Sequence, residues 1–65
     1  MKILLGEIMD KNNLSTRQVA EMTGISKSTI NRIVNEEISP TLDTLEVLAK
    51  GLNARICDLF DSPYK

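Results

Sequence analysis

Two short amphipathic segments, separated by only three residues, dominate the first half of this sequence. The run Ser15-Thr16-Arg17-Gln18 has the pattern of a capping box, in which the serine hydroxyl and the glutamine side chain each bind the other residue's backbone N–H. Gly24 ends this segment, because glycine accepts the left-handed backbone of a sharp helix exit. Ser26 is then placed to cap a second helix. The stretch therefore predicts two helices that cross steeply around a tight turn.

The rest of the chain continues the spacing of amphipathic helices. Apolar residues recur at three- and four-residue steps, and they are aliphatic, with one Phe, one Tyr and no Trp. We therefore expect a compact all-α fold of five helices, at about residues 2–11, 15–23, 27–35, 42–50 and 55–60. Pro40 and Thr41 precede the fourth helix, and Gly51 is expected just after its end. The expected core consists of Leu5, Ile8, Leu14, Val19, Ala20, Ile25, Ile30, Ile33, Leu45, Leu48, Leu52, Ile56 and Leu59.

Residues that carry catalysis are scarce in this chain. It contains no His and a single Cys, Cys57, so one chain can build neither a His/Cys metal cluster nor a Cys–His pair. No enzyme activity, cofactor or metal site is therefore expected. A lone Cys suits a reducing compartment, and no apolar run is long enough for a signal peptide or a membrane helix. We expect residues 1–65 to form one cytoplasmic domain with no membrane partner.

The net charge of −1 hides an uneven distribution. From Lys11 to Arg32 there are four basic residues and one acidic residue, which makes this stretch +3. Residues 33–65 carry three basic and six acidic residues, and therefore −3. The basic block coincides with the two-helix unit and favours a nucleic-acid partner, whereas the acidic second half favours a protein partner.

The central unit resembles a known family. Residues 14–30, LSTRQVAEMTGISKSTI, resemble the helix-turn-helix family of Cro-type and phage-repressor-type proteins, also called the xenobiotic-response-element family. PTLDTL at 40–45 and LNARICDLF at 52–60 resemble the later helices of that family, so the resemblance covers nearly the whole chain. It implies a lambda-repressor-like fold with its motif at about 15–35. It also implies a transcriptional regulator that binds double-stranded DNA sequence-specifically, with the second motif helix in the major groove.

The resemblance also implies which residues touch DNA. The base-reading positions of the family fall on Lys27, Ser28 and Arg32, and Asn31 joins them because it shares their face on a helical wheel. Arg and Lys suit the guanine edge and Asn suits adenine, although a polar helix face is in general more often simply solvated. Phosphate contacts of the family fall on Thr16, Thr29 and Asn35. Arg17, beside the exposed amides of the first motif helix, is a further expected phosphate ligand.

The sequence departs from the family pattern in three places. Met9 and Val34 replace an Arg and a Glu that often form an ion pair, so we expect these two apolar side chains to meet in the core. Glu36 stands where the family tends to use Gly, and Asn35 is expected to take the left-handed conformation instead. The pair Glu36-Glu37 also replaces basic residues that often hold phosphate, which predicts weaker DNA binding.

Two functions follow from these observations. The first is a repressor-like regulator that binds an operator as a homodimer, with its dimer surface at the carboxyl end around Arg55, Cys57, Phe60 and Tyr64. The alternative is a protein-interaction module on the same fold, such as an antitoxin or regulatory partner, that uses the acidic second half and binds DNA weakly or not at all. Salt dependence distinguishes them, because DNA binding weakens steeply as salt is added.

Overall fold

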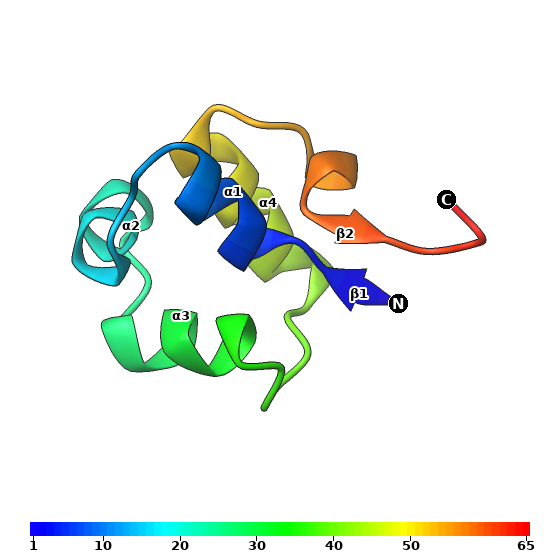
Figure 1. The fold of residues 1–65 in the computed structure, drawn as a ribbon, viewed down its shortest axis with the longest axis horizontal. Helices are drawn as coiled ribbons and strands as arrows, with labels where there is room; N and C mark the ends of the chain where they lie inside the picture. Colours follow the sequence, from blue (N-terminus) through cyan, green and yellow to red (C-terminus); the bar gives the residue numbers. More distant parts are fainter.

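The computed structural model describes residues 1–65. Four α-helices, one short 3-10 turn (η1) and two short strands follow one another along the chain. Their bounds are β1 Lys2–Ile3, α1 Leu5–Lys11, α2 Thr16–Thr23, α3 Lys27–Val34, α4 Leu42–Leu52, η1 Ile56–Asp58 and β2 Phe60–Asp61. In Figure 1, α3 lies along the lower edge of the molecule, while the strands and both termini lie at the end opposite α2. No helix has the length and apolar character that crossing a bilayer requires.

The expected compact, mostly helical fold is confirmed, but the count of five helices is not, because the chain differs from the expectation at both ends. The first helix begins at Leu5 rather than Lys2, and the expected helix at 55–60 is the turn η1 followed by β2. Strands β1 and β2 pair antiparallel, with Ile3 opposite Phe60, and the Leu4 N–H donates to the Leu59 carbonyl at 2.8 Å. The two ends of the chain exchange backbone hydrogen bonds that neither end could form alone, and this pairing replaces helix at both places.

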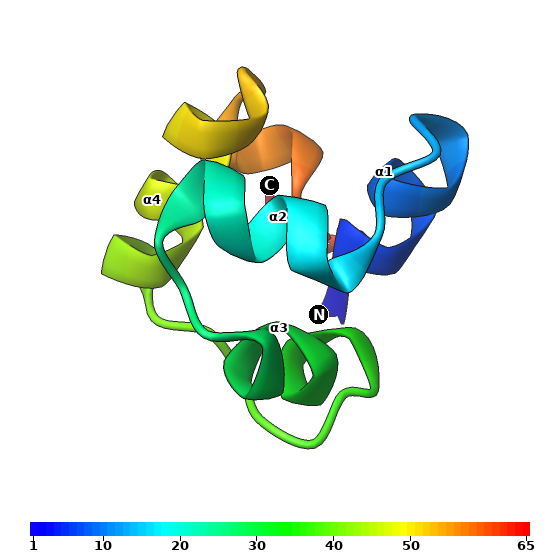
Figure 2. The ribbon, with the colours of Figure 1, turned by 90° about the vertical axis from the view of Figure 1, so that its left-hand side faces the viewer.

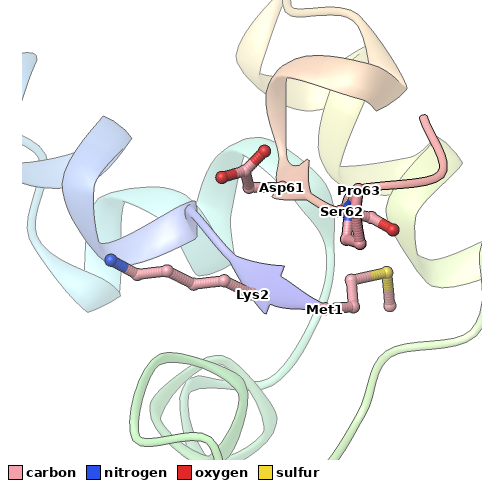
Figure 3. A pocket seen from close by; sticks show the side chains of 5 residues that line it. All are labelled: Met1, Lys2, Asp61, Ser62 and Pro63. Atoms are coloured by element: carbon pink, nitrogen blue, oxygen red, sulfur yellow. The ribbon is translucent and has the colours of Figure 1, made fainter.

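Charged side chains hold this small sheet from two sides. The Nζ of Lys2 lies 3.1 Å from Oε1 of Glu7, and this hydrogen bond raises the pKa of Lys2. The Nζ of Lys65 donates to the carbonyls of Cys57 and Phe60, each at 2.9 Å, and lies 5.5 Å from the centroid of the Phe60 ring. A shallow open pocket lies where the strands end, and the side chains that line it come from both termini (Figure 3).

Left-handed residues end all four helices, and only one of them is glycine. Gly24 has φ 78° after α2, as predicted, and Asn13 and Asn53 have φ 55° and 54° after α1 and α4. At the end of α3 the structure corrects the prediction that Asn35 is left-handed. Asn35 has φ −82°, and Glu36, at φ 61°, takes the left-handed conformation instead. An asparagine or glutamate in this conformation is held by the hydrogen bonds that close the helix end.

Gly51 lies inside α4, and not after its end as expected. A Cβ atom at this position would lie 2.7 Å from Cγ2 of Thr23 and 2.8 Å from the carbonyl oxygen of Met22. Gly51 therefore allows α4 to approach the end of α2 closely, which is a packing role rather than a role in ending a helix.

The core matches the predicted aliphatic set closely. Every predicted core residue is either fully buried or packed against the buried cluster, which also contains Met9 and Ala49. Val34 is half-buried against the same cluster, and its Cγ1 would lie 3.3 Å from a Cβ at Gly6 of α1. Met9 is thus buried and Val34 half-buried, while the expected contact between the two side chains stays a prediction.

Candidate nucleic-acid interface

Two capped helices build the centre of the site. The Ser15 hydroxyl accepts from the Gln18 N–H at 3.1 Å, and the Gln18 side chain accepts from the Ser15 N–H at 2.8 Å, so the predicted capping box is complete. At the start of α3, the Ser26 hydroxyl accepts from the Thr29 N–H at 3.2 Å. These local bonds fix where α2 and α3 begin, and therefore which residues face outward from each.

The turn between the two helices is held by side-chain bonds as well as by Gly24. The Thr23 hydroxyl donates to the Val19 carbonyl at 2.7 Å and accepts from the Ile25 N–H at 3.2 Å. Ile25 is half-buried and packs against the core. These contacts stabilise the turn between α2 and α3.

Helix α3 has one buried face and one exposed face. Ile30 and Ile33 are buried, and α3 lies at the periphery in both views, with the other helices on one side only (Figures 1 and 2). All four residues expected to read bases are exposed: Lys27, Ser28, Asn31 and Arg32. The two ion pairs of the chain are Lys2–Glu7 and Arg17–Glu21, so the charges of Lys27 and Arg32 are not neutralised by an acidic side chain.

A side-chain hydrogen bond joins α2 to this exposed face. The hydroxyl of Thr16, in the first turn of α2, donates to Oδ1 of Asn31 at 3.0 Å. The amino end of α2 therefore lies beside the outward side of α3. Sequence reasoning assigned these two residues separate contacts and missed the bond, because it spans 15 positions and depends on how the helices cross.

The other expected phosphate ligands differ in their exposure and in their hydrogen bonds within the chain. Asn35 is exposed at the end of α3. The Nε of Arg17 donates to Oε1 of Glu21 at 3.3 Å, and both side chains are exposed. Thr29 is half-buried, and its hydroxyl accepts from the Ser26 hydroxyl at 2.9 Å. Asn35 is therefore accessible to a phosphate, and the Nη groups of Arg17 remain free to donate while its Nε is bonded to Glu21.

The acidic pair stands directly after α3. Glu36 and Glu37 are both exposed, and they follow Asn35 on the tight turn that ends the helix. Two carboxylates beside an expected phosphate contact oppose an anionic ligand at this end of α3. The amino end of α3, with Lys27 and Ser28, carries no acidic neighbour in sequence.

Comparison with known proteins shows which family the chain belongs to. The family model described as "Helix-turn-helix" matches residues 5–59. The chain belongs to the helix-turn-helix family. The resemblance of the sequence to Cro-type and phage-repressor-type domains is thereby confirmed.

Several proteins named as regulators or control proteins are similar in sequence to this chain over most of its length. The HTH-type transcriptional regulator PuuR of Escherichia coli (strain K12) is 34% identical over 94% of the chain and 33% of its own length. The HTH-type transcriptional regulator SutR of the same organism is 34% identical over 91% of the chain and 33% of its own length. The Control protein C.SmaI of Serratia marcescens is 42% identical over 69% of the chain and 54% of its own length. The chain thus spans about a third of the length of PuuR and SutR.

Proposed function

We propose that this helix-turn-helix domain binds double-stranded DNA sequence-specifically and regulates transcription. The observation that carries the proposal is the exposed polar face of α3, where Lys27 and Arg32 have no acidic partner and the amino end of α2 lies alongside. A helix of this kind fits the major groove, and cations on it can pair with the guanine edge. Relatives that are named transcriptional regulators support the same function.

In this proposal the exposed face of α3 reads bases. Lys27, Ser28 and Arg32 contact base edges together with Asn31, while Thr29 and Asn35 approach the phosphates on either side. Arg17 exchanges Glu21 for a phosphate, which costs little because an exposed ion pair contributes only about 0–1 kcal/mol. The backbone amides of the first turn of α2 also face the phosphate chain.

We further propose that residues 1–65 act as one unit in the cytoplasm and bind DNA as a homodimer. A single helix-turn-helix offers a small interface, and pairing lets two copies of α3 read successive turns of the major groove. The acidic second half favours a protein-interaction module as the second candidate. The named functions of the relatives do not favour it.

Selection from a pool of randomised duplexes tests the proposal. We expect the chain to enrich one sequence, and the affinity for that sequence to fall steeply with salt because bound phosphates release counterions. A chain that enriches no sequence, and whose binding to duplex DNA is absent at low salt, would contradict it. Binding to a partner protein under the same conditions would then support the interaction module.

A further inference from the structure

Tyr64 projects from a turn that the chain itself holds. Its side chain is 95% exposed, although the backbone around it is bonded on both sides. The Tyr64 N–H donates to the Ser62 hydroxyl at 3.1 Å, and the Lys65 N–H donates to the Ser62 carbonyl at 3.3 Å. The Nζ of Lys65 donates to the carbonyls of Cys57 and Phe60, each at 2.9 Å. The ring is thus presented to solvent on a turn that is ordered before any partner arrives.

The pocket beside this turn has the chemistry that such a ring requires. We call it the strand-end pocket, and its walls are the side chains of Met1, Lys2, Asp61, Ser62 and Pro63 (Figure 3). Met1 and Pro63 lie on one side of it and offer a thioether and an apolar ring to an aromatic face. Asp61 extends to the other side, and its carboxylate is in no ion pair within the chain. A phenol suits this pocket, since its ring is apolar and its hydroxyl can donate to a carboxylate.

Tyr64 does not fill the pocket of its own chain, because its ring is left almost wholly in solvent. A projecting ring and an open pocket therefore lie next to each other on one surface. A surface of this kind is complementary to itself in a twofold dimer, where each contact is made twice with the roles of the two chains exchanged. The pair is continuous with the carboxyl-terminal surface around Arg55 and Cys57 that the sequence favours for dimerisation.

We propose that Tyr64 of one chain inserts into the strand-end pocket of a second copy, and reciprocally, so that the two carboxyl-terminal turns interlock. The inference rests on the proposed homodimer and names the contact that forms it. The ordered turn lowers the entropic cost of the insertion. The two rings bury roughly 300–500 Å² together, at about 150–250 Å² each. The interface is therefore small, and the dimer is expected to be weak in the absence of DNA.

This contact leaves the candidate DNA-binding surface open. In Figure 1, α3 follows the lower edge of the molecule, while the strands and both termini lie at one end of its longest axis. A twofold axis that passes this end and runs toward the DNA keeps both copies of α3 on the same side. Two half-sites on one face of a duplex require that arrangement.

Quenching of tyrosine fluorescence by acrylamide tests the insertion directly. The chain has one tyrosine and no tryptophan, so the emission reports on Tyr64 alone. Quenching of the wild-type chain should weaken as its concentration rises through the dissociation constant, because the second copy covers the ring. Asp61→Arg puts a long side chain into the pocket and should keep Tyr64 quenchable at every concentration, with the dissociation constant raised by about tenfold or more. Glu46→Arg makes the same change of charge on an exposed position of α4 and should behave as the wild type.

A mixture of Tyr64→Ala and Asp61→Arg provides a readout that a merely structural effect would not move. In the mixed pair, the ring of the Asp61→Arg chain meets the open pocket of the Tyr64→Ala chain, so one of the two contacts can form. The mixture should therefore associate more tightly than either variant alone in sedimentation equilibrium. Thermal melts of the separate variants check that both are folded, and the quenching of the wild-type chain needs no variant.

Three results would overturn the interlock: a wild-type ring that stays equally quenchable at all concentrations, a Glu46→Arg dimer as weak as that of Asp61→Arg, or a mixture that associates no better than its components. Selection from randomised duplexes separates this inference from the proposed DNA binding. A chain that enriches one duplex but leaves Tyr64 exposed refutes the interlock alone. A chain that dimerises through Tyr64 but enriches no duplex refutes the DNA-binding function alone.

Discussion

Glu36 occupies a backbone position at which glycine is the usual residue. Its φ is 61°, its N–H donates to the Ile33 carbonyl at 3.1 Å, and the Glu37 N–H donates to the Arg32 carbonyl at 2.8 Å. These two bonds form the closing pattern in which a left-handed residue follows a helix. A side chain with a Cβ atom costs about 1 kcal/mol or more in that conformation.

We therefore expect Glu36→Gly to raise the free energy of unfolding by about 1 kcal/mol, measured by urea denaturation. Glu37→Gly is the matched control, because Glu37 has no positive φ and gains no such relief. An equal rise in both variants would show that removing a negative charge, and not relaxing the backbone, stabilises the chain.

Arg32 and Arg17 separate base reading from phosphate binding. Arg32 is exposed on α3, and Arg17 is exposed at the start of α2. Arg32→Ala should cost about 1–3 kcal/mol of binding free energy on the preferred duplex and relax the choice at one base pair. Arg17→Ala should weaken binding to all duplexes alike and reduce the salt slope by about one.

Binding isotherms on matched and mismatched duplexes at two salt concentrations measure both effects. Glu21→Gln serves as a control, since it releases Arg17 from its ion pair and should strengthen binding without changing base preference. Uniform loss of affinity for every sequence in Arg32→Ala would mean that α3 does not read bases at that position.

The packing of α4 on α2 depends on one glycine. Thr23 cannot easily turn away from a Cβ at Gly51, because its hydroxyl is bonded to the Val19 carbonyl, and the Met22 carbonyl belongs to the backbone. Gly51→Ala should therefore destabilise the fold by about 1–3 kcal/mol through overpacking, despite the higher helix propensity of alanine.

Gly6→Ala is the matched control in a second helix. The new Cβ would meet only one methyl group of Val34, at 3.3 Å. We expect a change in the free energy of unfolding of less than about 1 kcal/mol, because the gain in helix propensity offsets a small shift of that methyl. Thermal melts of the two variants compare them directly, and an equal loss in both would show that α4 does not approach α2 closely at Gly51.

The elements that sequence analysis predicted well are those that short-range bonds define. Ser15, Ser26 and Thr41 each accept a backbone N–H three residues on, so the starts of α2, α3 and α4 are local and readable. Phe60, the first residue of β2, was predicted as the end of a helix, because the strand with which it pairs lies almost a whole chain length away. Gly51 was misplaced for a similar reason, since only the neighbouring helix shows why it is glycine.

The same distinction holds within the candidate site. The exposed face of α3 follows from helical spacing, and the structure agrees with it. The bond between Thr16 and Asn31 depends on the crossing of two helices, which spacing within either helix does not contain. Residue types alone therefore indicated that Asn31 suits adenine, but they did not indicate that Thr16 is its neighbour.

The molecule as a whole places its two expected contact surfaces on different elements. The residues expected to contact DNA lie on α2, on α3 and directly after α3, and the expected dimer residues lie in and around η1 and β2. Arg55, Cys57 and Tyr64 are exposed there, and Tyr64 is 95% exposed. Phe60 is half-buried against the core under Lys65, so it supports this surface more than it extends it.

Tyr64 offers the clearest test of the proposed homodimer. Because nothing within one chain covers its ring, Tyr64→Ala should leave the thermal melt of the monomer unchanged, while removing an aromatic side chain that interfaces favour. Sedimentation equilibrium should show a dimer for the wild-type chain and a dissociation constant raised about tenfold or more in Tyr64→Ala. Met22→Ala is the control, since Met22 is also an exposed apolar residue, at 45%, but lies on α2. Equal weakening by Met22→Ala would move the interface to the α2–α4 side, and a wild-type monomer both free and on a duplex with two half-sites would contradict the dimer.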